Sequence, residues 1–296
     1  MKIFVSGSTG LLGSALVPML RSDGHSVVRL VRGQAKSQSE VSWNPMEAID
    51  ASILSGADAV FHLGGEPVLG RWSEEKKRRI RDSRIESTRL LSEAMARMTT
   101  PPKYFGCASA TGIYGDRVDE VLSENSAPGI GFLADVCRDW EAATEPARAI
   151  GVRTNNFRIG IVLSDRGGAL AAMLTPFRLG LGGPIGSGKQ WTSWISRDDL
   201  IDAMRFCLHN EAISDAVNLV APNPVTNREL GQTLAKVLCR PAVLPLPAPM
   251  LKLAMGEAAD EMLLASQRVH PKVLCEHDFQ WQQPELEAAL RAILRC

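Results

Sequence analysis

The sequence contains little tyrosine and no surplus of either charge. Only two of its 296 residues are tyrosines, and its 33 basic and 33 acidic residues give a net charge of +0. Nucleic acids and anionic membranes attract proteins with a basic surplus, so we expect neither as a partner. Arg178 and Lys252 interrupt the two nearest candidates for a membrane span. No run of about 18 uncharged apolar residues therefore remains to form a transmembrane helix.

The cysteines and histidines lack the spacing of a disulfide scaffold or a metal site. The six cysteines stand at positions 107, 137, 207, 239, 275 and 296 without a CxxC pair, and the five histidines form no HExxH or HxH. Widely spaced cysteines are typical of reduced thiols, so we expect a cytoplasmic protein. An apolar stretch follows Lys2, but Gly7, Gly10 and Gly13 interrupt it, so we do not expect a signal peptide.

Short apolar runs alternate with helical patterns in the first half of the chain. The composition, 45% hydrophobic and 22% charged, is that of an ordinary globular protein. Strands are expected at residues 2–6, 26–31, 57–63, 104–108 and 153–163, and helices at 12–22, 73–98 and 132–149. This alternation predicts right-handed βαβ units. We therefore expect an α/β protein with a Rossmann-type doubly wound parallel sheet.

The pattern changes after residue 164. Seven glycines lie between 167 and 188, and four prolines lie between 241 and 249. Helices at 198–208 and 227–239 and a strand at 216–220 complete the expected elements, before a last helical region. We predict a nucleotide-binding domain at 1–165 and a smaller C-terminal lobe at 166–296 that covers the substrate, with room for the chain to return to the first domain.

A glycine-rich turn follows the first expected strand. Gly7, Gly10 and Gly13 fit the pattern GxxGxxG at the opening of a helix. Gly7 permits the tight turn, Gly10 lets a diphosphate approach the backbone, and Gly13 lets the helix pack closely on the sheet. The helix N-terminus then offers oriented N–H groups to the anion. This context favours a dinucleotide site over a glycine turn without a ligand.

The end of the second expected strand indicates which dinucleotide binds. An NAD-selective site has Asp or Glu there, but this chain has Val31, Arg32 and Gly33, with no carboxylate before Glu40. A guanidinium can bind a 2′-phosphate through paired charge-assisted hydrogen bonds. Arg32 therefore favours NADP over NAD, the alternative being a solvated surface arginine.

Several motifs resemble the extended short-chain dehydrogenases/reductases and, more narrowly, their atypical "epimerase family" subgroup. They are the glycine turn at 7–13, LGGEP at 63–67, RW at 71–72, SR at 83–84, SAT at 109–111, PFRLGLGGPIGSG at 176–188, and WI at 194–195 followed by two aspartates at 198–199. The resemblance covers nearly the whole chain. It implies an NAD-dependent epimerase/dehydratase with a C-terminal domain of unknown function.

The resemblance also implies NADP(H) as the cofactor. In the subgroup it is held at positions that match Arg32, Leu63, Gly64, Arg84 and Val162. Together with the glycine turn, the candidate cofactor-binding residues are Gly7, Thr9, Gly10, Leu11, Leu12, Gly13, Arg32, Leu63, Gly64, Arg84 and Val162.

The usual catalytic residues are only partly present. Hydride chemistry in the wider superfamily uses a Ser, a Tyr and a Lys four residues after the Tyr, where the Lys lowers the pKa of the Tyr. Ser109 follows the strand at 104–108, where the Ser is expected. If Glu141 matches the superfamily's helix glutamate, Leu133 and Cys137 replace the Tyr and the Lys, and neither can do their work.

The source of the proton is therefore open. Tyr114 lies just beyond the Ser-bearing strand and is a catalytic candidate, with a structural ring in a turn as its alternative. Asp135, Arg138 and Cys137 are further guesses from the helix. An activating histidine or helix N-terminus beside Cys137 is not evident.

Two functions remain open on these residues. The first is an NADP(H)-dependent oxidoreductase or nucleoside-diphosphate-sugar epimerase-like enzyme, acting on a small molecule such as a sugar nucleotide. The second is a non-catalytic NADP(H)-binding sensor or interaction protein that has lost the Tyr–Lys pair. Homodimers are common among related folds, but no residue here fixes one.

Two other patterns are expected to be structural. The run at 183–190 nearly fits a phosphate-binding P-loop, but Gln190 replaces the Mg²⁺-binding hydroxyl and no strand precedes Gly183. We expect this loop to cover the substrate cleft, with Lys189 available for an anionic group. The basic run at 76–81 alternates with acidic residues and is typical of a solvated helix face.

Overall fold

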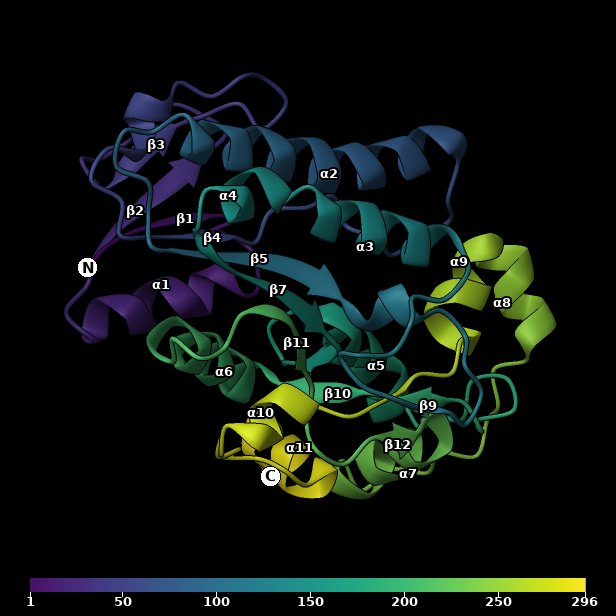
Figure 1. The fold of residues 1–296 in the computed structure, drawn as a ribbon. Helices are drawn as coiled ribbons and strands as arrows, with labels where there is room; N and C mark the ends of the chain where they lie inside the picture. Colours follow the sequence, from purple (N-terminus) through teal and green to yellow (C-terminus); the bar gives the residue numbers. More distant parts are fainter. Residues whose placement is uncertain (296) are drawn as a thin grey trace.

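Seven parallel strands form the central sheet of the computed structural model, which describes residues 1–295 (Figure 1). They are β1 (Lys2–Ser6), β2 (Ser26–Val31), β3 (Glu40–Ser42), β4 (Ala59–His62), β5 (Tyr104–Ala110), β7 (Arg153–Ile159) and β11 (Asp215–Leu219). The spatial order is β11-β7-β5-β4-β1-β2-β3. The order reverses between β1 and β4, and open parallel sheets bind ligands at such a switch point, beyond the carboxyl ends of the strands.

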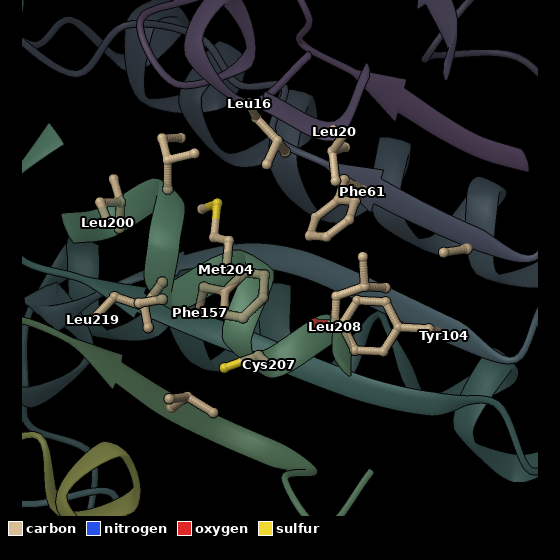
Figure 2. Close-up of a cluster of buried hydrophobic side chains, with 14 of the residues drawn as sticks. Leu16, Leu20, Phe61, Tyr104, Phe157, Leu200, Met204, Cys207, Leu208 and Leu219 are labelled. Atoms are coloured by element: carbon tan, nitrogen blue, oxygen red, sulfur yellow. The ribbon is translucent and has the colours of Figure 1, made fainter. Parts of the chain in front are cut away.

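Helices cover both faces of the sheet, as the strand–helix alternation predicted. On one face lie α1 (Gly13–Ser22) and α6 (Arg197–His209), and on the other lie α2 (Glu74–Ala96), α3 (Phe132–Ala142) and α4 (Glu145–Ala149) (Figure 1). Figure 2 shows Phe61, Tyr104 and Phe157 of the strands among leucines of α1 and α6. The sheet is therefore buried on both sides, which explains its continuous apolar runs.

A separate apolar cluster lies outside the central sheet. It is formed mainly by β8 (Ile161–Leu163), α5 (Gly168–Arg178), β10 (Trp194–Ser196), α7 (Asn227–Val237) and α11 (Leu286–Leu294). The other elements are η1 (Ala51–Leu54), η2 (Thr111–Tyr114), β6 (Val121–Leu122), β9 (Trp191–Thr192), β12 (Val225–Thr226), α8 (Ala248–Met255), α9 (Glu257–Ala259), η3 (Asp260–Leu264), β13 (Arg268–Val269) and α10 (Lys272–Glu276). The chain returns to the central sheet after residue 165, because β11 pairs with β7, α6 packs beside α1, and α10 packs against β11.

Two expected elements are divided in the structure. The strand predicted at 153–163 breaks at Gly160, where an added Cβ would lie 2.7 Å from Ser193 O, and β8 then leaves the main sheet to pair with β10. The helix predicted at 132–149 breaks after Ala142, and Pro146 opens the separate helix α4. Close backbone contact and proline, respectively, cause these breaks.

Candidate functional site

The glycine-rich turn joins β1 to α1 at the switch point. Gly7 adopts a φ of +66° and lies against β4, since an added Cβ would approach Leu63 C at 2.6 Å. At Gly13 an added Cβ would meet Gly7 O at 2.3 Å, so only glycine fits. No side chain caps α1 and no acidic residue occupies its first turn. Ser14 N and Ala15 N already donate to Gly10 O (2.9 Å) and Leu12 O (3.0 Å), so the N–H groups of residues 11–13 are the ones left for an anionic ligand.

Two arginines near this turn lack a carboxylate partner. Arg32 lies exposed just beyond β2 and has no hydrogen bond or ion pair within residues 1–295. Arg84 of α2 donates through Nη1 to Glu66 O (3.0 Å) and Ile80 O (3.1 Å), and it lies over the Trp140 ring. Burial lowers the pKa of Arg84. A phosphate would supply the counter-charge that both guanidinium groups lack.

His62 is the last residue of β4, and two hydrogen bonds hold its ring in place. Its Nδ1 shares a hydrogen bond with Ser6 Oγ at 2.5 Å, and its Nε2 shares one with Ser87 Oγ at 2.9 Å. Burial lowers the pKa of His62 to about 4, so the ring is neutral at pH 7. The ring thereby ties β1, β4 and α2 together beside Leu63 and Gly64.

Two of the remaining candidate cofactor residues meet at the start of α5. A Cβ added to Gly168 would contact Leu11 Cδ2 at 3.4 Å and Val162 O at 3.6 Å, so the glycine turn, β8 and the start of α5 meet there. Thr9 is exposed on the turn, and Leu12 packs against the apolar cluster of α1 and α6. The contacts thus place Gly7 against Leu63 and Gly64, and Leu11 near Val162, while the roles of all the predicted cofactor residues stay predictions.

A large cavity lies at the carboxyl ends of β5 and β7. It has a volume of about 730 Å³ and is lined by Ala110–Gly112, Ile159–Ile161, α5, the loop at 181–185 and the segment at 261–267. Two lining segments, at Gly183 and Leu244, touch through their backbones, since an added Cβ at Gly183 would lie 1.9 Å from Leu244 O. Segments distant in sequence therefore enclose this space.

Ser109 lies outside the lining of this cavity. Side chains alternate along a strand, so Ala110 faces the cavity while Ser109 points to the opposite side. There its Oγ donates to Glu141 Oε1 at 2.7 Å. Both oxygens of Glu141 also accept from Arg158, each at 2.9 Å. Ser109 thus belongs to a buried polar network near the C-terminal ends of α3 and β7.

Tyr114 belongs to the same network. It is fully buried, its hydroxyl donates to Asn218 Oδ1 at 2.7 Å, and it accepts from Arg158 Nη1 at 3.0 Å. Burial raises the pKa of Tyr114. A saturated, enclosed phenol of raised pKa is poorly placed to exchange protons with a substrate.

The helix that should carry the Tyr–Lys pair offers no acid or base to the cavity. Leu133 lines it, and Cys137 is buried with its pKa raised by burial to about 12. Glu261 also lines the cavity, but its two oxygens accept from Phe132 N and Leu133 N, each at 2.7 Å. Glu261 therefore caps α3 and fastens the segment after α9 to it.

Two polar residues that sequence reasoning missed face the cavity beside the end of β5. Thr111 Oγ1 donates to Gln267 Oε1 at 3.0 Å, and the Gln267 amide N–H groups have no partner in the described chain. Ser193 Oγ donates to the backbone carbonyl oxygen of Gln267 at 2.7 Å. Strand alternation would have placed Thr111 on the side of Ser109, but β5 ends at Ala110 and the chain turns into η2 at Thr111, and no local pattern identifies Gln267.

The other patterns noted in the sequence are structural. The basic run on α2 pairs with acids including Glu66, Asp139 and Glu257, as a solvated helix face does. Lys189 is exposed and does not line the cavity, although its loop does through Gly182, Gly183 and Ile185. The loop therefore covers the cavity as expected, without presenting the lysine to it.

One cluster of possible metal ligands lies outside the cleft. Ligand atoms of Asp23, His25 and His209 lie within 4.8 Å of one another. Arg205 Nε lies 2.9 Å from Asp23 Oδ2, and the N-terminal ammonium lies 3.4 Å from His25 Nδ1. These cations compete for the atoms that a metal would need. Separately, none of the helices within residues 1–295 is both long and apolar enough to cross a membrane.

Comparisons with known proteins identify the relatives of this chain. It is 41% identical over 290 residues to an epimerase family protein of Mycobacterium bovis, covering 97% of this chain and 96% of the relative. The human epimerase family protein SDR39U1 is 36% identical over 300 residues, covering 99% of this chain and all of the relative.

Solved structures agree. Human SDR39U1 crystallised with NADPH superposes with a TM-score of 0.92 at 34% identity, over 100% of this chain and 99% of that one. A nucleoside-diphosphate sugar epimerase from Corynebacterium glutamicum gives 0.83 at 37% identity, over 99% of this chain and 58% of that longer chain. A UDP-glucuronic acid 4-epimerase from Bacillus cereus, at 16% identity and a TM-score of 0.80, shares the fold alone.

Two family models match separate parts of the chain. A domain of unknown function, DUF1731, matches residues 246–293. The model of the NAD dependent epimerase/dehydratase family matches residues 3–219, which is most of the chain. With its Rossmann-type sheet and glycine turn, this chain belongs to the NAD-dependent epimerase/dehydratase family.

Proposed function

We propose that this chain binds NADP(H) in the cleft at the β1–β4 switch point. The observation that carries the proposal is the cradle at Gly7 and Gly13, which a single Cβ would fill and which ends on an uncapped helix N-terminus. The pyrophosphate would lie on the N–H groups of α1, and the unpaired Arg32 would bind the 2′-phosphate. The NADPH in crystals of human SDR39U1 supports the same choice of cofactor.

We further propose an oxidoreductase that acts on a carbonyl or alcohol group. Bound NADP(H) supplies or accepts a hydride in such chemistry. The chain's own contribution is to orient the substrate oxygen with the free Gln267 amide N–H, while Thr111 holds that amide through its oxygen. The proton of the substrate hydroxyl comes from water or returns to it, because Glu261, the acid in the described cavity lining, is already hydrogen-bonded.

A non-catalytic NADP(H) sensor is the second candidate. The observation in its favour is that Leu133 and Cys137 replace the usual pair while Tyr114 is enclosed in the protein network. Such a protein would retain the cofactor cleft without turnover.

Turnover separates these two functions. NADPH absorbance would be followed over a panel of carbonyl compounds with wild type, Gln267→Met and Ser109→Ala. We expect Gln267→Met to lower kcat at unchanged NADPH affinity, and Ser109→Ala to retain kcat. Loss of turnover in Ser109→Ala at full NADPH affinity would return the catalytic role to Ser109. Silence of the wild type across the panel, with tight NADPH binding, would favour the sensor.

Three narrower features complete the proposal. A cytoplasmic location is supported by the free state of all five cysteines within residues 1–295. A homodimer rests on analogy with related folds. A sugar nucleotide, the substrate class that the family resemblance implies, is the alternative against which the substrate class argued below is tested.

A further inference from the structure

The cavity beside the cofactor cleft is walled mainly by apolar side chains. Its wall includes Met173, Phe177, Leu181, Leu230, Leu246 and Met262. Small residues of α5, Ala169 and Ala172, face the same space and leave it wide. An apolar wall binds by removing hydrocarbon from water, at roughly 25 cal/mol per Å² of apolar surface.

The cavity has almost no charge with which to bind a phosphate. Glu261 is the single charged side chain in its lining as described, and no lysine or arginine joins it. The N-terminus of α3 opens towards the cavity, but the Glu261 carboxylate already occupies its N–H groups. A nucleoside diphosphate needs cations or free backbone donors, so this space would leave its charge uncompensated.

The apolar wall continues to the mouth of the cavity. Leu69, Leu181, Leu244 and Leu246 line the cavity and are each at least 40% exposed. Exposed leucines that line the same cavity are costly in water unless they meet an apolar ligand. They also allow a hydrocarbon chain to extend from the inner end of the cavity to solvent.

Three polar side chains, Thr111, Ser193 and Gln267, lie together beside the end of β5. Of the other polar residues in the lining, Asn227 accepts from Ile185 N at 2.8 Å and Glu261 caps α3, so both are held by backbone groups of the protein. Such an arrangement suits a ligand with one polar group at one end. It does not suit a sugar, whose hydroxyls need partners on every side.

We propose that the substrate is an uncharged, largely apolar carbonyl compound or its alcohol, and not a sugar nucleotide. The assignment rests on the proposed oxidoreductase function. The carbonyl lies at Thr111 and Gln267, and the hydrocarbon runs along α5 to the leucines of the mouth. In the reduction, the carbonyl carbon gains a hydride as NADPH becomes NADP⁺, the C=O π bond breaks, and the oxygen takes a proton from water.

A binding experiment tests the cavity independently of the cofactor. N-Phenyl-1-naphthylamine, a neutral apolar fluorophore, would be titrated into the full chain and displaced with 2-decanone or UDP-glucose. The matched variants are Leu181→Arg and Leu179→Arg: both leucines are exposed, at 57% and 68%, but only Leu181 lines the cavity.

We expect Leu181→Arg to weaken probe binding about tenfold or more and Leu179→Arg to leave it within about twofold. 2-Decanone should displace the probe, and UDP-glucose should not. Absent probe binding, equal effects of the two variants, or displacement by UDP-glucose would each overturn the proposal.

A turnover experiment extends the test to chemistry. With NADPH present, kcat/KM across methyl ketones from 2-butanone to 2-decanone should rise about fourfold for each added methylene. A flat series, or turnover of UDP-glucose, would overturn the assignment. If NADPH does not bind, the proposed function fails while the probe experiment still decides the chemistry of the cavity. If no ketone reacts, displacement of the probe by 2-decanone decides in the same way.

Discussion

The predicted cofactor cleft and the cavity both lie at the carboxyl ends of strands of the central sheet, yet they are built in opposite ways. The cleft is made of backbone and cations: glycines that admit no side chain, an uncapped helix N-terminus, and two arginines without a carboxylate. The cavity is made of apolar side chains with a few polar groups at one end. The first arrangement suits a polyanion, and the second suits a neutral hydrocarbon with one polar group.

A third region has the residue types of a catalytic site but belongs to neither of them. The buried network of Ser109, Glu141, Arg158 and Tyr114 lies behind the end of β5, facing away from the cavity. Its residue types are those of an active site, but their hydrogen bonds are made within the protein. The contrast between cleft and cavity therefore requires that this network stabilises the fold and takes no part in catalysis.

The largest expected effect tests that network. Glu141→Gln would leave the buried Arg158 without its counter-charge, so we expect the free energy of unfolding to fall by about 3–5 kcal/mol in urea titration. Asp139→Asn, two residues away in an exposed pair with Arg81, should cost less than about 1 kcal/mol. Unchanged stability with lost turnover in Glu141→Gln would instead make the network part of the active site.

Acidic pH should lower the free energy of unfolding through the buried His62. The pKa of His62 is about 4 in the fold against 6.5 when unfolded, so the unfolded chain takes up a proton first. The neutral ring therefore makes its full contribution to the free energy of unfolding above pH 6.5. About 3 kcal/mol of this contribution is lost as the pH falls from 6.5 to 4. His62→Gln should flatten this part of the pH profile of unfolding. A wild-type profile without a slope there would contradict the prediction.

A methyl group in the glycine turn should damage the cleft and spare the cavity. An added Cβ at Gly13 meets Gly7 O, so Gly13→Ala should lower NADPH affinity about a hundredfold by calorimetry. Gly33→Ala is the control, since no atom lies within 4 Å of its added Cβ. Loss of N-phenyl-1-naphthylamine binding in Gly13→Ala but not in Gly33→Ala would show that cleft and cavity are not separable.

The smallest expected effect concerns the choice of coenzyme. Arg32→Ala removes charge-assisted hydrogen bonds to the 2′-phosphate, so NADPH affinity should fall about tenfold while NADH affinity stays unchanged. Arg21→Ala, on the exposed side of α1, should alter neither. An equal loss for both coenzymes would show that Arg32 does not read the 2′-phosphate.

The parallel sheet and the glycine turn could be predicted from the sequence because local chemistry dictates them. Apolar runs alternate with helical patterns in the sequence. At Gly7 and Gly13 the backbone of neighbouring segments comes so close that no side chain fits. The expected coenzyme, NADP(H), agrees with the NADPH bound to human SDR39U1. The roles of individual cofactor residues remain predictions.

The polar site beside the cavity could not be predicted in the same way. The parity of a strand decides which side a residue faces, and a shift of one position exchanges Ser109 for Ala110. Gln267 and Glu261 reach the cavity from a segment about 150 residues beyond β5, through tertiary packing that leaves no local pattern. The apolar character of the cavity likewise emerges only when its distant walls are brought together.

The central claim is that backbone amides and a nearby guanidinium form a site for NADP(H). Isothermal titration of the purified, nucleotide-free chain with NADPH and with NADH tests it directly. We predict saturable heat with NADPH at a dissociation constant well below that for NADH. The absence of binding heat with both coenzymes would contradict the account.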